Sequence, residues 1–243
     1  MKIRIDVPVY NRKDITEIVL TQLQKTKDPS DVLRIYNDNS TEYDDNFLKA
    51  FGEVKNYDVK CEHRWQNIHK IRSLAFRDFL LEDFDFLYMT DNDALHDPNW
   101  RNELLQGYEE TKLPMSGYIS GYMYNNFDYY KRQFTNSRFM PIHSTGGGIS
   151  ILLHKSHVRT IVDRMGVSDM QDMWDCTTWG YLNNRYALTR QSFLDHFGKG
   201  GLHHQTWDQE RAINPTSYLI NIRQSMIDYL ENKIGKDGIL QKV

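Results

Sequence analysis

The first 90 residues alternate between short apolar runs and longer segments with helical spacing, and this order constrains the fold more than any other feature. Four apolar runs predict strands, at residues 3–9, 32–36, 57–61 and 84–89. Two segments between them predict helices, 14–25 with Asp14 placed as a cap, and 68–81. Strands that alternate with helices in this way favour a parallel sheet covered by helices on both faces, an α/β fold.

Polar clusters follow three of these predicted strands. They are Tyr10-Asn11-Arg12, Asp38-Asn39-Ser40 and Asp91-Asn92-Asp93. In open α/β sheets, ligands bind beyond the carboxyl ends of the strands. We therefore expect the three clusters to share one ligand-binding rim.

Composition excludes several classes of protein. The chain has 243 residues and a net charge of -3, so it does not resemble a sequence-independent nucleic-acid binder. Its 2 cysteines lack CxxC spacing, which argues against a zinc cage or a disulfide framework. The opening MKIRIDVPVYNR has no apolar signal segment, and no stretch approaches the roughly 18 apolar residues of a membrane span. A cytoplasmic location is expected.

The Asp91-Asn92-Asp93 cluster suggests a metal site. Two carboxylates at i and i+2 can share a divalent ion, and Mg²⁺ or Mn²⁺ prefers oxygen ligands together with substrate phosphates. The alternative is a solvated turn, because Asp is common in turns and 97–100 looks like a helix start.

Four segments, in order and spacing, resemble the inverting family-2 glycosyltransferases of the GT-A fold. They are VPVYNR (7–12), NDNST (37–41), QNIHKIRSLAF (66–76) and TDND (90–93). The resemblance covers roughly residues 3–200. It implies a GT-A fold, a Rossmann-like nucleotide-binding sheet with a fused acceptor-side subdomain. One domain over 1–243 would comprise a nucleotide-sugar-binding half (1–95), an acceptor and catalytic half (96–215) and a C-terminal helix (216–243).

The same resemblance assigns the nucleotide and metal residues. Those implied to contact the nucleotide are Pro8, Tyr10, Asn11, Arg12, Asp38, Arg72, Asp91 and Asn92. Asp38 would bind the uracil or the ribose, Asp91 would lie on the ribose side, and Asp93 would hold the metal.

Segments of the second half resemble the acceptor and catalytic regions of the family. In STGGGISILLHK (144–155), Gly147 and Gly148 would let the backbone approach the sugar closely, although a tight hairpin without a ligand is an alternative. In DMWDCTTWGYLNN (172–184), Asp175 is favoured as the catalytic base because it opens a helical run, and Asp172 is the other candidate. Family members often have Glu-Asp in this region, and this chain does not.

The tryptophans of that segment and the later histidines add further candidates. Trp174 and Trp179 would either stack on a sugar or pack in the core. In SFLDHFGKGGLHH (192–204), His196 best matches a metal-binding His, with His203 and His204 in reserve; a surface loop is the alternative.

The expected function is therefore Mn²⁺- or Mg²⁺-dependent transfer of a sugar, with inversion, from a nucleotide diphosphate sugar to a hydroxyl acceptor. A UDP-sugar donor, a hexosyltransferase activity, and a glycan or other hydroxyl acceptor in polysaccharide or glycoconjugate synthesis are favoured. No nucleic-acid partner is expected.

Three alternatives remain open. The first is a GT-A binding module without catalysis. The second is a sugar-nucleotide nucleotidyltransferase, although VPVYNRKD lacks the glycine-rich loop typical of that class. The third is a phosphatase that uses an Asp nucleophile. The sequence does not explain Asp6, a carboxylate inside an apolar strand.

Overall fold

A computed structural model describes eight parts of the chain: residues 1–56, 65–118, 138–143, 147–171, 173–189, 192–196, 227–228 and 232–234. The strands are β1 (Ile3–Val9), β2 (Val32–Asn37), β3 (Glu53–Asn56), β4 (Phe86–Thr90), β5 (Ala94–His96), β6 (Met115–Ser116), β7 (Phe139–His143), β8 (Ser150–His154), β9 (Arg185–Thr189) and β10 (Leu194–His196). The helices are α1 (Lys13–Thr26), α2 (Asp45–Lys49), α3 (Trp65–Leu80), α4 (Trp100–Thr111), α7 (Lys155–Met165) and α8 (Trp174–Tyr181).

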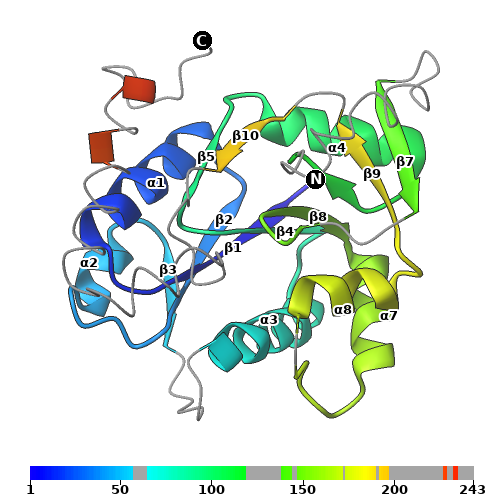
Figure 1. The fold of residues 1–243 in the computed structure, drawn as a ribbon, viewed down its shortest axis with the longest axis horizontal. Coiled ribbons are helices and arrows are strands. Elements are labelled where there is room, and N and C mark those ends of the chain that lie inside the picture. The colour runs from blue at the N-terminus through cyan, green and yellow to red at the C-terminus, as the bar shows by residue number, and fades with distance from the viewer. Residues whose placement is uncertain are drawn as a thin grey trace, which may run out of the picture.

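The central sheet has eight strands in the order β3-β2-β1-β4-β8-β6-β9-β7 (Figure 1). The first four pair in parallel, as the strand-helix order predicts. From β8 onward the sheet is mixed, because β8 runs antiparallel to β4 and to β6, and β7 runs antiparallel to β9. The parallel pairing expected for the first 90 residues is therefore confirmed for β1, β2 and β4, whereas the sheet as a whole is mixed. The β-α-β order that requires parallel pairing ends at β4.

Helices cover both faces of this sheet, as expected. Side chains of β4 alternate between the faces, so Phe86 and Tyr88 pack on one side and Leu87 and Met89 on the other. The first side carries apolar residues of α1 and α4, and the second carries those of α3, α7 and α8 (Figure 1). The α/β fold class follows from these two apolar layers.

Most predicted elements of the first half lie within a few residues of their observed bounds, but two details differ. Asp14 lies in the first turn of α1 and does not cap it; the cap position belongs to Arg12, whose backbone is left-handed. The predicted strand at 57–61 lies outside the described residues, and the described strand β3 ends just before it. The Tyr-rich segment at 116–134, whose composition also suggests β-structure, lies outside them from residue 119 onward, as does most of 216–243.

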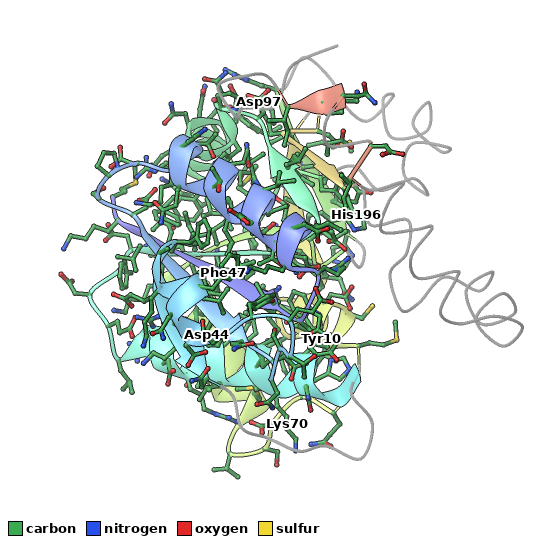
Figure 2. All side chains as sticks on the ribbon, turned by 90° about the vertical axis from the view of Figure 1, so that its left-hand side faces the viewer. Tyr10, Asp44, Phe47, Lys70, Asp97 and His196 are labelled. Atoms are coloured by element: carbon green, nitrogen blue, oxygen red, sulfur yellow. The ribbon has the colours of Figure 1, made fainter. Side chains whose placement is uncertain are left out.

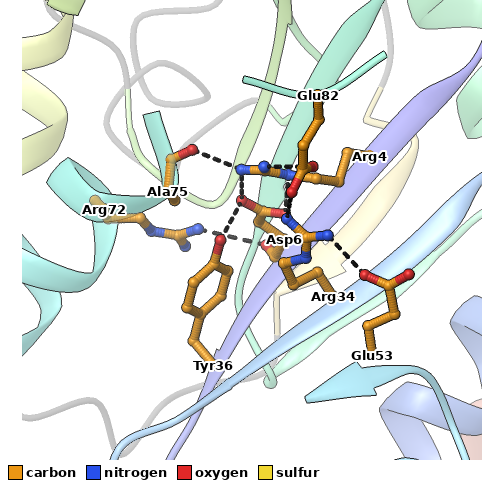
Figure 3. A network of polar contacts seen from close by, with 8 residues as sticks. All are labelled: Arg4, Asp6, Arg34, Tyr36, Glu53, Arg72, Ala75 and Glu82. Atoms are coloured by element: carbon orange, nitrogen blue, oxygen red, sulfur yellow. Dashed lines mark hydrogen bonds and ion pairs between the residues drawn. The ribbon is translucent and has the colours of Figure 1, made fainter. Parts of the chain in front are cut away.

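Asp6 lies in a buried ionic network beneath the sheet (Figure 3). The neighbouring apolar side chains of β1 face the other layer, which leaves Arg4 and Asp6 on the α3 side. Both side chains are fully buried, and Arg4 Nη2 lies 2.7 Å from Asp6 Oδ2. Tyr36 donates its hydroxyl to the same carboxylate (3.3 Å), and Arg4 also pairs with Glu82 (3.0 Å). Asp6 is therefore an internal counterion and not a solvent-facing residue.

Removal of this carboxylate will leave Arg4 buried with less of its charge compensated. We expect Asp6→Ala to lower the free energy of unfolding by about 3 kcal/mol or more, as is typical when one partner of a buried ion pair is lost. Urea denaturation measures the change. Asp83→Ala is the control, because it removes a fully exposed partner of Lys2 and will barely move the midpoint. Equal effects of the two substitutions would show that burial of the pair is irrelevant.

Candidate functional site

The carboxyl ends of β1, β2 and β4 form the rim that the sequence predicts, and β10 adds a fourth side. Because β1 pairs in parallel with both β2 and β4, their three polar clusters follow neighbouring strands. Strand β10 pairs with β5, which directly follows the Asp91-Asn92-Asp93 turn, and this pairing places His196 opposite Ala94. Figure 2 shows Tyr10 and His196 along the same side of the molecule.

Asn11 and Arg12 reverse the chain at the end of β1 through two left-handed residues, with φ of 47° and 56°. Asn11 Oδ1 accepts the backbone N–H of Thr41 (2.7 Å), which ties the end of β1 to the loop after β2. Arg12 Nη2 donates to Asn92 Oδ1 (2.8 Å), and Arg12 Nη1 lies 3.5 Å from Asp93 Oδ2. The left-handed turn thus directs a cation at the Asp91-Asn92-Asp93 cluster.

Asp38 lies at the end of β2 and is almost buried. Its backbone N–H donates to Val9 O (2.9 Å), and its Oδ1 accepts from Asn67 Nδ2 of α3 (2.7 Å). Sequence reasoning did not single out Asn67, although it lies within the 66–76 segment that resembles the family. Asp38 and Asn67 together form the polar wall of the rim between β2 and α3.

Asp91 is the more exposed carboxylate of its cluster, with 32% of its side chain accessible. Its Oδ1 accepts from Nη2 of the fully buried Arg72 (2.8 Å), which also donates to Thr90 O (2.9 Å). Asn92 uses its amide within the protein, because its Nδ2 donates to Thr16 Oγ1 of α1 (3.0 Å). Asn92 therefore holds the turn in place, and Asp91 faces outward above Arg72.

Within the described residues, His196 is the one histidine whose side chain pairs with Asp93. His196 Nε2 lies 3.4 Å from Asp93 Oδ1, and the edge of the Tyr118 ring packs on the His196 ring with centroids 5.8 Å apart. Tyr118 is a second residue that sequence reasoning missed; it lies in the Tyr-rich segment but outside any motif.

The two carboxylates have opposite pKa shifts. Burial raises the pKa of Asp91, and the charge of Asp93 raises it further, against the opposing effect of Arg72. Burial would also raise the pKa of Asp93, but hydrogen bonds and charges from His196 and Arg12 outweigh it and hold this pKa below its ordinary value. Asp93 is therefore the more firmly ionised of the two and the better candidate for a metal ligand.

The donor set fits a hard divalent ion that is held partly by its substrate. Two ligand atoms that each lie about 2.1 Å from an ion, at a right angle to each other, are about 3 Å apart. This is close to the 3.4 Å between Asp93 Oδ1 and His196 Nε2. Within the described residues, no group of three or more His, Cys, Asp and Glu side chains could hold an ion by itself. Mg²⁺ and Mn²⁺ sites commonly take their other ligands from phosphates and water.

The Asp93–His196 pair makes stability depend on pH. Burial alone would lower the pKa of His196, but the hydrogen bond and charge of Asp93 raise it above its ordinary value. The stabilisation is therefore fully present below the unfolded pKa of about 6.5 and is lost as pH rises through the folded pKa. We expect the contribution of this pair to the unfolding free energy of the metal-free protein to fall over that interval, and His196→Gln to lack this contribution. Urea midpoints measured across the interval test this, with the exposed His143→Gln as a control that keeps the wild-type slope.

Asp175 lies where the sequence predicts, in the first turn of α8, and is half-buried. Trp179 is fully buried and packs on Tyr186 with ring centroids 4.5 Å apart, so sugar stacking is wrong for this residue and core packing is correct. A Cβ on Gly148 would overlap the ring of Trp174, whereas one on Gly147 would meet no atom within 4 Å. Gly148 thus makes room for Trp174.

The second base candidate and the reserve histidines lie outside the described residues: Asp172, His203 and His204.

Comparisons by sequence find no matching protein family and no matching curated protein. Solved structures do match. S. aureus TarS in complex with UDP-GlcNAc superposes with a TM-score of 0.58 at 12% identity, over 86% of this chain and 64% of that chain. The TarS complex with UDP gives 0.57 at 13% identity, over 80% and 60%.

The mannosyltransferase PcManGT from Pyrobaculum calidifontis, in complex with GDP-Man and Mn²⁺, gives a TM-score of 0.57 at 13% identity, over 86% of this chain and 60% of that chain. This chain therefore spans less than two thirds of the length of each of these structures. The likeness confirms the expected fold, which is a GT-A-like glycosyltransferase fold. In the described part of the chain, no helix is both long and apolar enough to cross a membrane.

Proposed function

We propose that this chain, which has a GT-A-like glycosyltransferase fold, transfers a sugar from a nucleotide diphosphate sugar to a hydroxyl group. One observation carries the proposal. The ends of β1, β2 and β4, together with β10, bring a cation, three carboxylates and an imidazole to one rim. These groups are Arg12, Asp38, Asp91, Asp93 and His196.

The nucleoside part of the donor would lie along β1 and β2. Asp38, backed by Asn67, would bind the base or the ribose, and Asp91 would accept from a ribose hydroxyl. Pro8 and Tyr10 line the same strand end and would contact the nucleotide. A UDP-sugar is the favoured donor. The TarS and PcManGT complexes contain UDP-GlcNAc, UDP and GDP-Man, which supports nucleotide-sugar binding on this fold.

Asp93 and His196 would hold Mn²⁺ or Mg²⁺, and the PcManGT complex with Mn²⁺ supports a divalent ion on this fold. When bound, such an ion stabilises the negative charge that develops on the leaving diphosphate. The hydrogen bond from His196 and the charge of Arg12 hold the pKa of Asp93 below its ordinary value, which favours the ionised form that binds a metal.

Asp175 would take the proton from the acceptor hydroxyl as that oxygen attacks the anomeric carbon, and Asp172 is the second candidate. A single base on the acceptor side gives inversion. The acceptor would be a glycan or another molecule with a free hydroxyl, and Gly147 would let the backbone approach it, since a Cβ on this residue would meet no atom within 4 Å.

Incubation with UDP- and GDP-sugars and mixed glycan acceptors, with and without Mn²⁺, tests the proposal. We expect Mn²⁺-dependent release of the nucleoside diphosphate together with a glycosylated product of inverted configuration. Binding without release would favour the GT-A binding module. Formation of pyrophosphate from a nucleoside triphosphate and a sugar phosphate would favour the nucleotidyltransferase.

A further inference from the structure

Trp174 is held from three sides at the start of α8. Its ring lies under the guanidinium of Arg72, whose Cζ is 4.5 Å from the ring centroid. Its backbone N–H donates to Nδ1 of His69 (3.2 Å), one turn earlier than Arg72 on α3. The six-membered part of its ring occupies the space that a Cβ on Gly148 would fill. With only 8% of Trp174 exposed, the ring is not free to stack on a sugar.

Arg72 connects this ring to the nucleotide side of the rim. The same fully buried guanidinium that stacks on Trp174 donates to Asp91 Oδ1 (2.8 Å) and to Thr90 O (2.9 Å). A planar, delocalised cation can stack on a ring with its face and donate hydrogen bonds from its edge at the same time. Arg72 therefore fixes the distance between Asp91 and Trp174.

Within the described residues, the N-terminus of α8 has no side-chain cap. Met173 occupies the N-cap position with a left-handed backbone (φ 40°), and it makes no side-chain capping bond to the helix. A capping side chain normally anchors the first turn of a helix. Here Trp174 supplies the contacts, and Asp175 is the next residue.

We propose that Trp174 is a positioning residue, which fixes the first turn of α8 so that Asp175 is held in register with Asp91 through the Arg72 guanidinium. This inference rests on the proposed function, because it concerns the placement of the base that the function requires. A base displaced by about 1 Å costs roughly 100-fold in rate, whereas donor binding does not depend on it.

Trp174→Leu keeps an apolar side chain but removes the aromatic face. We expect kcat to fall about 10- to 100-fold while the KM for the donor changes little, since the lost interaction acts on the reacting geometry. Trp174→Phe restores a face for Arg72 and will recover most of the rate. Trp179→Leu is the matched control on the same helix. It will lower the melting temperature, but the kcat of the folded protein will stay close to wild type.

Gly148→Ala tests the same contact without changing the tryptophan, and it serves also if Trp174→Leu does not fold. The added Cβ overlaps the Trp174 ring, so we expect kcat to fall as in Trp174→Leu. In the Trp174→Leu background the alanine will cost almost nothing more, because the two changes remove one interaction. A full, additive loss in that background would overturn the proposal, since Gly148 would then act directly on the substrate.

The wild-type assay separates this inference from the proposed function. If the wild-type protein transfers sugar and the Trp174→Leu and Trp179→Leu variants have equal kcat, the positioning role alone is overturned. Wild-type protein that neither binds nucleotide sugars nor transfers sugar overturns the proposed function, and the positioning role with it.

Discussion

Asp93→Ala will lower the kcat of metal-dependent sugar transfer by about a thousandfold or more. A bound metal ion stabilises the leaving diphosphate by several kcal/mol, and each loss of about 1.4 kcal/mol lowers the rate about tenfold. Asp93 is the carboxylate that His196 and Arg12 hold ionised, so its removal takes away the carboxylate that we propose as the metal ligand. Steady-state release of the nucleoside diphosphate over a range of Mn²⁺ concentrations measures the effect.

Asp195→Asn is the matched control for this substitution. Asp195 precedes His196 on β10 and is half-buried, and successive side chains of a strand point to opposite faces. We expect its loss to leave the dependence on Mn²⁺ unchanged. Wild-type turnover by Asp93→Ala, with the circular dichroism spectrum of the folded protein, would end the assignment of Asp93.

Asp175→Asn will lower kcat by about 100- to 10,000-fold, the usual contribution of a general base, and will leave the binding of the nucleotide sugar unchanged. The amide has nearly the shape of the carboxylate and can still accept the N–H of Cys176 through its oxygen (2.8 Å in the carboxylate form). The loss therefore reports the missing base and not a disturbed helix. Single-turnover transfer and nucleotide titration measure the two quantities separately.

Asp163→Asn, which removes an exposed carboxylate on the neighbouring helix α7, controls for general charge effects and will retain activity. Asp172→Asn decides between the two candidates. Retained activity in Asp175→Asn, with loss in Asp172→Asn, would move the base to Asp172 and refute the assignment of Asp175.

The sequence was sufficient for the features whose physical cause is local. Apolar runs bounded by polar turns placed β1, β2 and β4, because strands buried on both faces need continuous apolar residues. The spacing of apolar residues placed α1 and α3, because a helix that packs on a sheet needs an apolar stripe along one face. Polar residues directly after those strands then had to lie at one end of the sheet, which located Asp38 and Asp91 at the rim.

Features that depend on contacts distant in sequence could not be predicted in this way. The antiparallel pairing of β8 with β4 joins segments about 60 residues apart, and no local pattern specifies its direction. His196 was chosen by resemblance alone, whereas its position next to Asp93 depends on the pairing of β10 with β5. The burial of Trp179 likewise depends on its packing against Tyr186 of β9, and the stacking of Trp174 under Arg72 depends on how α8 packs against α3.

Asp6 illustrates the same limit. A carboxylate inside an apolar run has no local explanation, because its partners come from elsewhere in the fold. Arg4 lies on the same strand, Tyr36 on β2 and Glu82 beyond α3. Only the packed structure shows that Asp6 neutralises a buried arginine.

Thermal unfolding of the wild-type chain tests directly whether the rim binds a nucleotide diphosphate sugar together with a divalent ion. Melting temperatures would be measured with UDP, GDP and their sugars, each with and without Mn²⁺. A ligand at about 100 times its dissociation constant adds about 2.7 kcal/mol, or roughly 5–10 °C for a chain of this size. We expect such a shift in melting temperature for one nucleotide series. The shift will require Mn²⁺ and will be lost in Asp93→Ala. An unchanged melting temperature across the whole panel would contradict it.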